Sequence, residues 1–206
     1  MKNSTIRLLI PVVCSMAVAL SGCGGSPAHT QRWSSPPAMQ IDTSKTYYAV
    51  FNTSMGSFKI KLFAAEAPKT VNNFVFLARQ KFYDGTIFHR IIKPFMIQGG
   101  DPLGTGMGGP GYNIPDELPV KYSYDPGIIA MANTGRANTG GSQFFICTGT
   151  DAASLNKSPI YTQFGKVVEG MDVVLKIAAV PVVSANGEVS KPVKPPVIKT
   201  ITIEES

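Results

Sequence analysis

Short apolar runs, separated by clusters of glycine, proline, asparagine and aspartate, most limit how this chain can fold. The second run alternates strictly, with Phe58, Ile60 and Leu62 on one face and lysines on the other. Period-two patterns between turn residues are typical of β-strands with one face in water. Eight strands are therefore predicted, over residues 46–52, 57–63, 87–92, 96–98, 128–132, 143–147, 164–168 and 193–203.

Helical spacing is confined to two segments of the same region. Pro68 stands where a first helical turn tolerates proline, and apolar residues recur at one-face spacing from Val71 to Ala78. A second helix is predicted over residues 171–179. A parallel sheet needs a helix at nearly every crossover, so two helices among eight strands favour an all-β fold. We expect a closed eight-stranded antiparallel barrel capped by two α-helices.

The first residues form a segment distinct from the domain. Lys2 and Arg7 precede a mostly apolar run from Leu8 to Leu20, which is the pattern of a secretory signal and is short for a membrane span. Leu20-Ser21-Gly22-Cys23 follows and resembles the lipobox of bacterial lipoproteins, in which cleavage before the cysteine precedes its acylation. We expect a signal peptide over residues 1–22 and a lipid on Cys23 that anchors the protein to a membrane of the bacterial cell envelope. An ordinary cleaved signal with a chance cysteine is the alternative.

The segment after Cys23 differs in composition from the domain that follows it. Glycine, serine, proline, glutamine and threonine dominate, and Trp33 is its only large aromatic residue, which predicts a flexible tether over residues 23–44 and a domain over residues 45–206. With Cys14 in the signal and Cys23 lipidated, Cys147 is the one remaining thiol, so no internal disulfide is expected. Cys147 is predicted to be a buried apolar side chain.

Several common classes of function fit the residues poorly. A net charge of +6 without a basic run between aromatic residues argues against nucleic-acid binding. The glycines of residues 104–109 match GxGxxG but precede Pro110 rather than a helix, which argues against a dinucleotide site. His29 and His89 are too few and too far apart for a structural zinc site, and Ser142 lacks the GxSxG frame. No cofactor and no metal are expected.

Arg90 is out of place on an otherwise apolar strand. In the run from Phe88 to Ile92, a period of two puts Arg90 on the same face as Phe88 and Ile92. A permanent charge buried without partners is costly, so this one must be paired or open to a functional cleft. An arginine that extends into water at the rim of the barrel is the alternative interpretation.

Neighbouring predicted strands carry polar amides beside large apolar side chains. Met96 and Gln98 share one face of their strand, and Gln143 and Phe145 share one face of theirs. If these faces meet that of Arg90, they form an apolar socket with convergent hydrogen-bonding groups, as in many small-ligand and peptide sites.

Taken together, several segments resemble the signature segments of cyclophilins in order and spacing. The similarity covers residues 45–205, and residues 104–118 resemble the bacterial branch of the family. The resemblance implies an eight-stranded antiparallel barrel with a packed interior and a substrate groove along its outside. The matching segments are Phe88-His89-Arg90-Ile91-Ile92, Phe95-Met96-Ile97-Gln98-Gly99-Gly100-Asp101, Met131-Ala132-Asn133, Gly141-Ser142-Gln143-Phe144-Phe145-Ile146 and Phe164-Gly165-Lys166-Val167.

The resemblance also implies roles for individual residues. Arg90 matches the catalytic arginine, Gln98 matches a residue that orients it, and Asn133 matches one that holds the peptide backbone before proline. The positions that match the proline pocket and the peptide groove are Phe95, Met96, Gly106, Ala132, Gln143, Phe145, Leu155 and Tyr161.

Two positions depart from many eukaryotic members of the family. They have a tryptophan where this chain has Ser154, and a histidine where it has Tyr161. The first departure is expected to weaken cyclosporin binding rather than catalysis, because the drug packs against that tryptophan ring. The second keeps a planar side chain with a polar end, so the pocket wall is expected to persist.

The function that the resemblance implies is that of a monomeric peptidyl-prolyl cis-trans isomerase. Its partners would be proline-containing polypeptides, and it would assist the folding of envelope proteins. A non-catalytic proline-peptide binding module or a membrane-anchored chaperone is the alternative, and a barrel enclosing a small apolar ligand is a third. Residues 182–196 are expected to be a loop that joins the second helix to the last strand.

Overall fold

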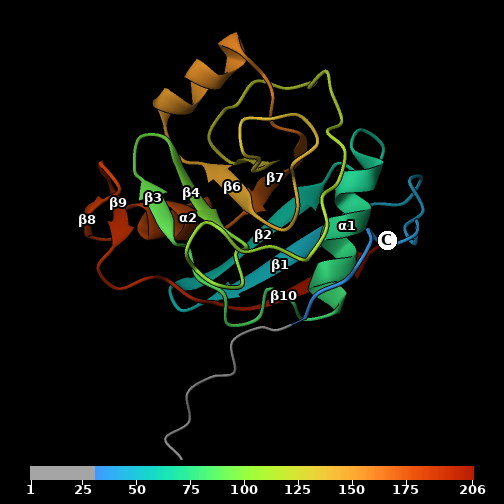
Figure 1. Ribbon diagram of the computed structural model, residues 1–206, viewed down its shortest axis with the longest axis horizontal. Coiled ribbons are helices and arrows are strands. Elements are labelled where there is room, and N and C mark those ends of the chain that lie inside the picture. Colours follow the sequence, from blue (N-terminus) through green and yellow to red (C-terminus); the bar gives the residue numbers. More distant parts are fainter. Residues whose placement is uncertain (1–30) are drawn as a thin grey trace, which may run out of the picture.

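One curled antiparallel sheet forms the body of the computed structural model, which describes residues 31–206 (Figure 1). Its strands follow the order β10-β1-β2-β7-β5-β6-β4-β3, and the eight predicted strands are all present. The signal peptide and Cys23 lie outside the described residues. The bounds are β1 (Tyr47–Thr53), β2 (Gly56–Leu62), β3 (Arg90–Ile92), β4 (Met96–Gly99), β5 (Ile128–Met131), β6 (Phe144–Cys147), β7 (Gln163–Glu169) and β10 (Ile198–Glu205).

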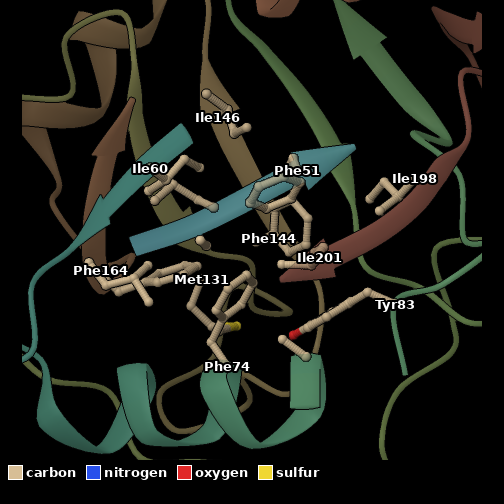
Figure 2. Packing of buried hydrophobic residues seen from close by; sticks show 14 of the residues in the cluster. Phe51, Ile60, Phe74, Tyr83, Met131, Phe144, Ile146, Phe164, Ile198 and Ile201 are labelled. Atoms are coloured by element: carbon tan, nitrogen blue, oxygen red, sulfur yellow. The ribbon is translucent and has the colours of Figure 1, made fainter. Parts of the chain in front are cut away.

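The main core lies between the concave face of this sheet and the helix α1 (Pro68–Arg79). Figure 2 shows Phe74 pointing from α1 toward the sheet, where its ring lies 5.2 Å from that of Phe164 and 5.9 Å from that of Phe144. Phe51 and Phe58 stack with their ring centroids 4.6 Å apart. Each such side chain contributes about 1.5–3 kcal/mol by leaving water, so this core is the main source of stability.

Besides α1, residues 31–206 contain two further helical segments. The helix α2 (Met171–Ala178) packs its buried face, which includes Val174 and Ile177, against the sheet, as its spacing predicts. A 3-10 helix, η1 (Thr150–Lys157), follows β6 and was not predicted. No helix within residues 31–206 is long and apolar enough to cross a bilayer.

The prediction of a fully closed barrel is overstated. Strands β10 and β3 end the sheet, and a single bridge between Ile87 and Val197 links the segments beside them. Two backbone bonds flank this bridge, from Ile198 to Thr86 at 2.8 Å and from Phe88 to Pro196 at 3.0 Å. Because β3 is only three residues long, the result is a curled half-barrel rather than a continuous closed ladder.

The strand predicted over residues 87–92 is interrupted before Arg90. Regular pairing begins only at Arg90, so the period of two does not run through Phe88 and His89. Phe88 is fully buried in the main core, whereas Arg90 is half-exposed on the opposite side. The expectation that Arg90 shares a face with Phe88 is therefore wrong, while Ile92 does lie on the outer side with Arg90.

Part of the expected flexible tether belongs to the folded domain. Trp33 packs edge-on against Phe76 at 5.2 Å, and its backbone N–H donates to Pro110 O at 2.9 Å. The Asn72 side chain accepts from Gln40 N at 2.7 Å and donates to Ala38 O at 3.0 Å. One indole and a buried amide thus bind residues 32–44, called the strap from here on, to α1, although their composition is that of a flexible tether.

The expected loop over residues 182–196 contains a β-hairpin. Strand β8 (Val182–Ala185) pairs with β9 (Glu188–Pro192), and Asn186 and Gly187 between them have φ angles of 53° and 81°. Two central residues with positive φ match the right-handed twist of a tight hairpin. Figure 1 places the hairpin beside β3, and β9 contacts that strand.

Candidate functional site

A second apolar cluster lies on the face of β4, β5 and β6 that points away from the main core. Alternation along β4 explains it, because Ile97 enters the main core while Met96 faces outward. The rings of Phe145 and Tyr161 meet edge-on at 5.3 Å. This outer apolar cluster brings together six of the predicted site residues, namely Phe95, Met96, Ala132, Phe145, Leu155 and Tyr161.

A chain of hydrogen bonds begins at Arg90 beside this cluster. Arg90 and Gln98 are direct partners in the register of β3 and β4, and Arg90 Nη1 lies 3.4 Å from Gln98 Oε1 and 3.9 Å from Met96 Sδ. Gln98 Nε2 donates to Gln143 Oε1 at 3.0 Å. Gln143 Nε2 in turn donates to the carbonyls of Gly106 and Gly108 at 3.0 and 2.9 Å. Each glutamine in this series of hydrogen bonds accepts through its side-chain oxygen and donates through its side-chain nitrogen.

Asp101 holds the glycine loop at the far end of that chain. Its fully buried carboxylate accepts backbone N–H bonds from Leu103 at 2.8 Å, Thr105 at 2.9 Å and Gly106 at 2.5 Å. Burial tends to raise the pKa of Asp101, but these backbone donors outweigh it and the pKa is lowered. A Cβ at Gly108 would lie 2.0 Å from Asp101 Oδ1, so only glycine fits there.

A groove of about 510 Å³ runs beside the glycine loop. Five of the predicted residues line it, namely Gln98, Gly106, Ala132, Asn133 and Gln143, together with Arg32 of the strap. The Asn133 side chain is engaged within its own region, where it donates to Ile160 O and accepts from Gly135 N, both at 2.9 Å. Asn133 therefore lines the groove without a hydrogen bond from its side chain to Arg90 or Gln98.

Glu188 is a site residue that sequence reasoning missed. Its carboxylate accepts from Arg90 Nε at 2.7 Å and from Arg90 Nη2 at 2.8 Å, which makes a bidentate ion pair. The hydrogen bond from Arg90 lowers the pKa of Glu188 although burial opposes it. The Asn186-Gly187 pair between short β-prone runs is a hairpin signal, but it does not reveal which strand the hairpin would face.

Burial favours the neutral form of two other titratable side chains near the site. Burial raises the pKa of Cys147 to about 12, which keeps the thiol protonated, and the prediction of a buried apolar role is confirmed. Burial lowers the pKa of His89 against the opposing charge of Asp101. Among residues 31–206, no group of three or more histidine, cysteine, aspartate or glutamate side chains gathers as metal ligands.

Sequence comparisons find one matching family and many relatives. The family model described as "Cyclophilin type peptidyl-prolyl cis-trans isomerase/CLD" matches residues 48–203. Peptidyl-prolyl cis-trans isomerase A of Mycobacterium tuberculosis is 42% identical over 174 residues, which cover 77% of this chain and 92% of that protein. Peptidyl-prolyl cis-trans isomerase-like 2 of Rhizopus delemar is 46% identical over 142 residues, which cover 67% of this chain but only 26% of the longer relative.

Solved structures share the same fold. A cyclophilin type peptidyl-prolyl cis-trans isomerase of Cryptosporidium parvum superposes with a TM-score of 0.69 at 35% identity, covering 78% of this chain and 99% of that one. A second crystal structure of that protein, determined in the presence of the dipeptide Ala-Pro, gives a TM-score of 0.68 at 36% identity and covers 77% and 99% of the two chains.

Proposed function

This chain belongs to the family of cyclophilin-type peptidyl-prolyl cis-trans isomerases, and we propose that it catalyses X-Pro isomerisation with Arg90 as the residue that lowers the barrier to rotation. One observation carries the proposal, which is the place of the Arg90 guanidinium. It contacts Met96 of the outer apolar cluster and bonds to Gln98, which lines the polar groove. A charged donor thus stands where a proline ring and its peptide backbone would meet.

The chemistry needs no nucleophile. Amide resonance opposes rotation with a barrier of about 18–20 kcal/mol, and in the twisted transition state the prolyl nitrogen loses conjugation and becomes a better hydrogen-bond acceptor. A guanidinium held nearby stabilises that state more than the planar ground state, which is the condition for catalysis. Arginine suits this task because its planar fork stays charged while one edge is held by other residues.

The remaining predicted residues fall into two groups, one that holds the proline ring and one that holds the peptide backbone. The outer apolar cluster holds the proline ring through Phe95, Met96, Phe145, Leu155 and Tyr161. The groove holds the backbone before proline, with Gly106, Ala132, Asn133 and Gln143 along its wall. Fixing one side of the bond and gripping the ring on the other leaves rotation as the motion available.

An exchange assay separates this enzyme from a non-catalytic binding module. Wild-type protein is added in substoichiometric amount to a short X-Pro peptide, and the cis-trans exchange rate is measured by NMR. We expect exchange to rise in proportion to enzyme concentration. A pure binder would shift or broaden the peptide signals without accelerating exchange, and that result would refute the proposed function.

We further propose that the protein is a lipoprotein of the bacterial cell envelope, anchored through acylated Cys23, and that it acts on envelope proteins there. The support is the basic start, the apolar run and the Leu20-Ser21-Gly22-Cys23 segment. Arg32 at the groove follows Cys23 by nine residues, and a fully extended chain of that length reaches about 30 Å. The anchor therefore keeps the groove near the membrane surface.

Metabolic labelling tests the anchor separately from the enzyme activity. Wild-type protein expressed with a labelled fatty acid should carry the label and sediment with membranes, whereas Cys23→Ala should lose both properties. Cys147→Ala is the matched control, because it removes a thiol that is buried in the domain. Unchanged labelling of Cys23→Ala would rule out lipidation at that residue.

A further inference from the structure

A carboxylate holds one edge of the Arg90 guanidinium, and the other edge faces the candidate site. Nε and Nη2 donate to the two oxygens of Glu188 at 2.7 and 2.8 Å, whereas Nη1 points toward Gln98 and Met96. A guanidinium is planar and presents its N–H groups in fixed directions. Binding one edge to a carboxylate therefore fixes where the other edge points.

The β8–β9 hairpin brings Glu188 beside the strand that carries Arg90. Glu188 is the first residue of β9 and comes directly after the Asn186-Gly187 turn, whose two positive φ angles set the register of the hairpin. The hairpin lies against β3, the strand that begins with Arg90. Ser190 provides a further hydrogen bond to Glu188, so the carboxylate has partners on both β3 and its own strand.

We propose that Glu188 is a positioning residue for Arg90, and that the β8–β9 hairpin is part of the catalytic machinery of this chain. The inference rests on the proposed role of Arg90. Without Glu188, rotation about the last bonds of the arginine side chain would let the guanidinium leave the socket, because the 3.4 Å contact with Gln98 is long for a hydrogen bond. With Glu188 in place, Nη1 stays directed at the bound peptide.

A carboxylate beside a catalytic cation has a second effect, which opposes the first. It lowers the positive potential that the twisted peptide bond would feel. Both side chains are partly exposed, at 35% for Arg90 and 40% for Glu188, so water screens part of this loss. Glu188 also binds the edge of the guanidinium away from Gln98 and does not occupy Nη1. Orientation is therefore the larger effect, and removing Glu188 is expected to slow the enzyme.

Steady-state kinetics on an X-Pro peptide test this inference in three variants. Glu188→Ala should reduce kcat about fivefold or more while KM changes less than twofold, because orientation matters most in the transition state. Glu188→Gln keeps side-chain length and one acceptor oxygen, so it should retain more activity than Glu188→Ala. Glu204→Gln is the matched control, since it removes an equal charge from the ion pair with Lys59 on the sheet edge and should match wild type.

An NMR signal distinguishes positioning from a general effect on stability. The Nε–H resonance of Arg90 should be protected from solvent exchange in wild type, and this protection should fall in Glu188→Ala while the melting temperature stays within about 2 °C. Wild-type kcat in Glu188→Ala would overturn the inference, and so would a higher kcat, which would mean that Glu188 masks the arginine. If wild-type protein itself fails to accelerate exchange, the proposed function fails instead, so the two failures are distinguishable.

Discussion

Replacing Asp101 by asparagine tests whether a single buried carboxylate shapes the groove. The two oxygens of Asp101 accept backbone N–H bonds from Leu103, Thr105 and Gly106. Hydrogen bonds to a charged acceptor contribute about 1.5–3 kcal/mol each. In Asp101→Asn one acceptor becomes an NH2 group that faces N–H donors, whichever way the amide is turned. At least one hydrogen bond is lost, and the remaining ones are made to a neutral acceptor instead of a charged one.

The expected loss in the free energy of unfolding is about 2–4 kcal/mol, which corresponds to a fall of roughly 5–15 °C in melting temperature for a domain of this size. The isomerase activity should fall as well, because Gly106 and Gly108 of the same loop accept from Gln143, which is bonded through Gln98 toward Arg90. Thermal unfolding and kcat/KM are measured on the same preparation. Asp172→Asn, which changes an exposed carboxylate on α2, is the control and should match wild type.

The lowered pKa of Asp101 predicts how the stability difference between wild type and Asp101→Asn changes with pH. The pKa of Asp101 is lower in the folded protein than its ordinary value, so its contribution to stability is complete above the unfolded pKa near 4. That contribution disappears as pH falls through the lowered pKa of the folded state. The stability gap between wild type and Asp101→Asn should therefore narrow in acid. A gap that is absent at pH 7, or one that widens in acid, would refute the reasoning.

Three further predictions concern the strap, the free thiol and a crowded glycine. Trp33→Ala should lower the free energy of unfolding by about 1–3 kcal/mol in denaturant titrations, because the half-buried indole packs on Phe76; no change would place the strap outside the fold. Cys147 should react with a thiol reagent only when the protein unfolds, since its pKa is raised to about 12; rapid labelling of native protein would contradict its burial. Gly100→Ala should destabilise the fold by about 2 kcal/mol or more by chemical denaturation, because φ is +82° and a Cβ would lie 2.4 Å from Ser142 O; a neutral effect would show that this turn relaxes.

Local periodicity predicted the elements well, because strands and helices with one wet face show it in sequence. The alternation of Phe58, Ile60 and Leu62 gave β2, and the one-face spacing after Pro68 gave α1. The outward placement of Gln98 followed from the same rule, although the alternation failed at Phe88, where pairing is interrupted.

Contacts between distant segments could not be predicted in this way. Glu188 and Arg90 are 98 residues apart, and no local pattern says that the hairpin folds against β3. The strap had the composition of a linker, yet Trp33 and the buried Asn72 were enough to fix it. Closure of the sheet also depends on contacts between distant strands, and the edge strand β3 is too short to form a continuous ladder there.

The most direct test of the account is the rate of X-Pro exchange catalysed by wild type and by Arg90→Ala, measured by NMR together with the affinity of each protein for the peptide. The account predicts at least a tenfold loss of catalysed exchange, equivalent to about 1.4 kcal/mol of transition-state stabilisation, with peptide affinity changed less than about threefold. Near-normal exchange by folded Arg90→Ala would contradict the central role of this residue.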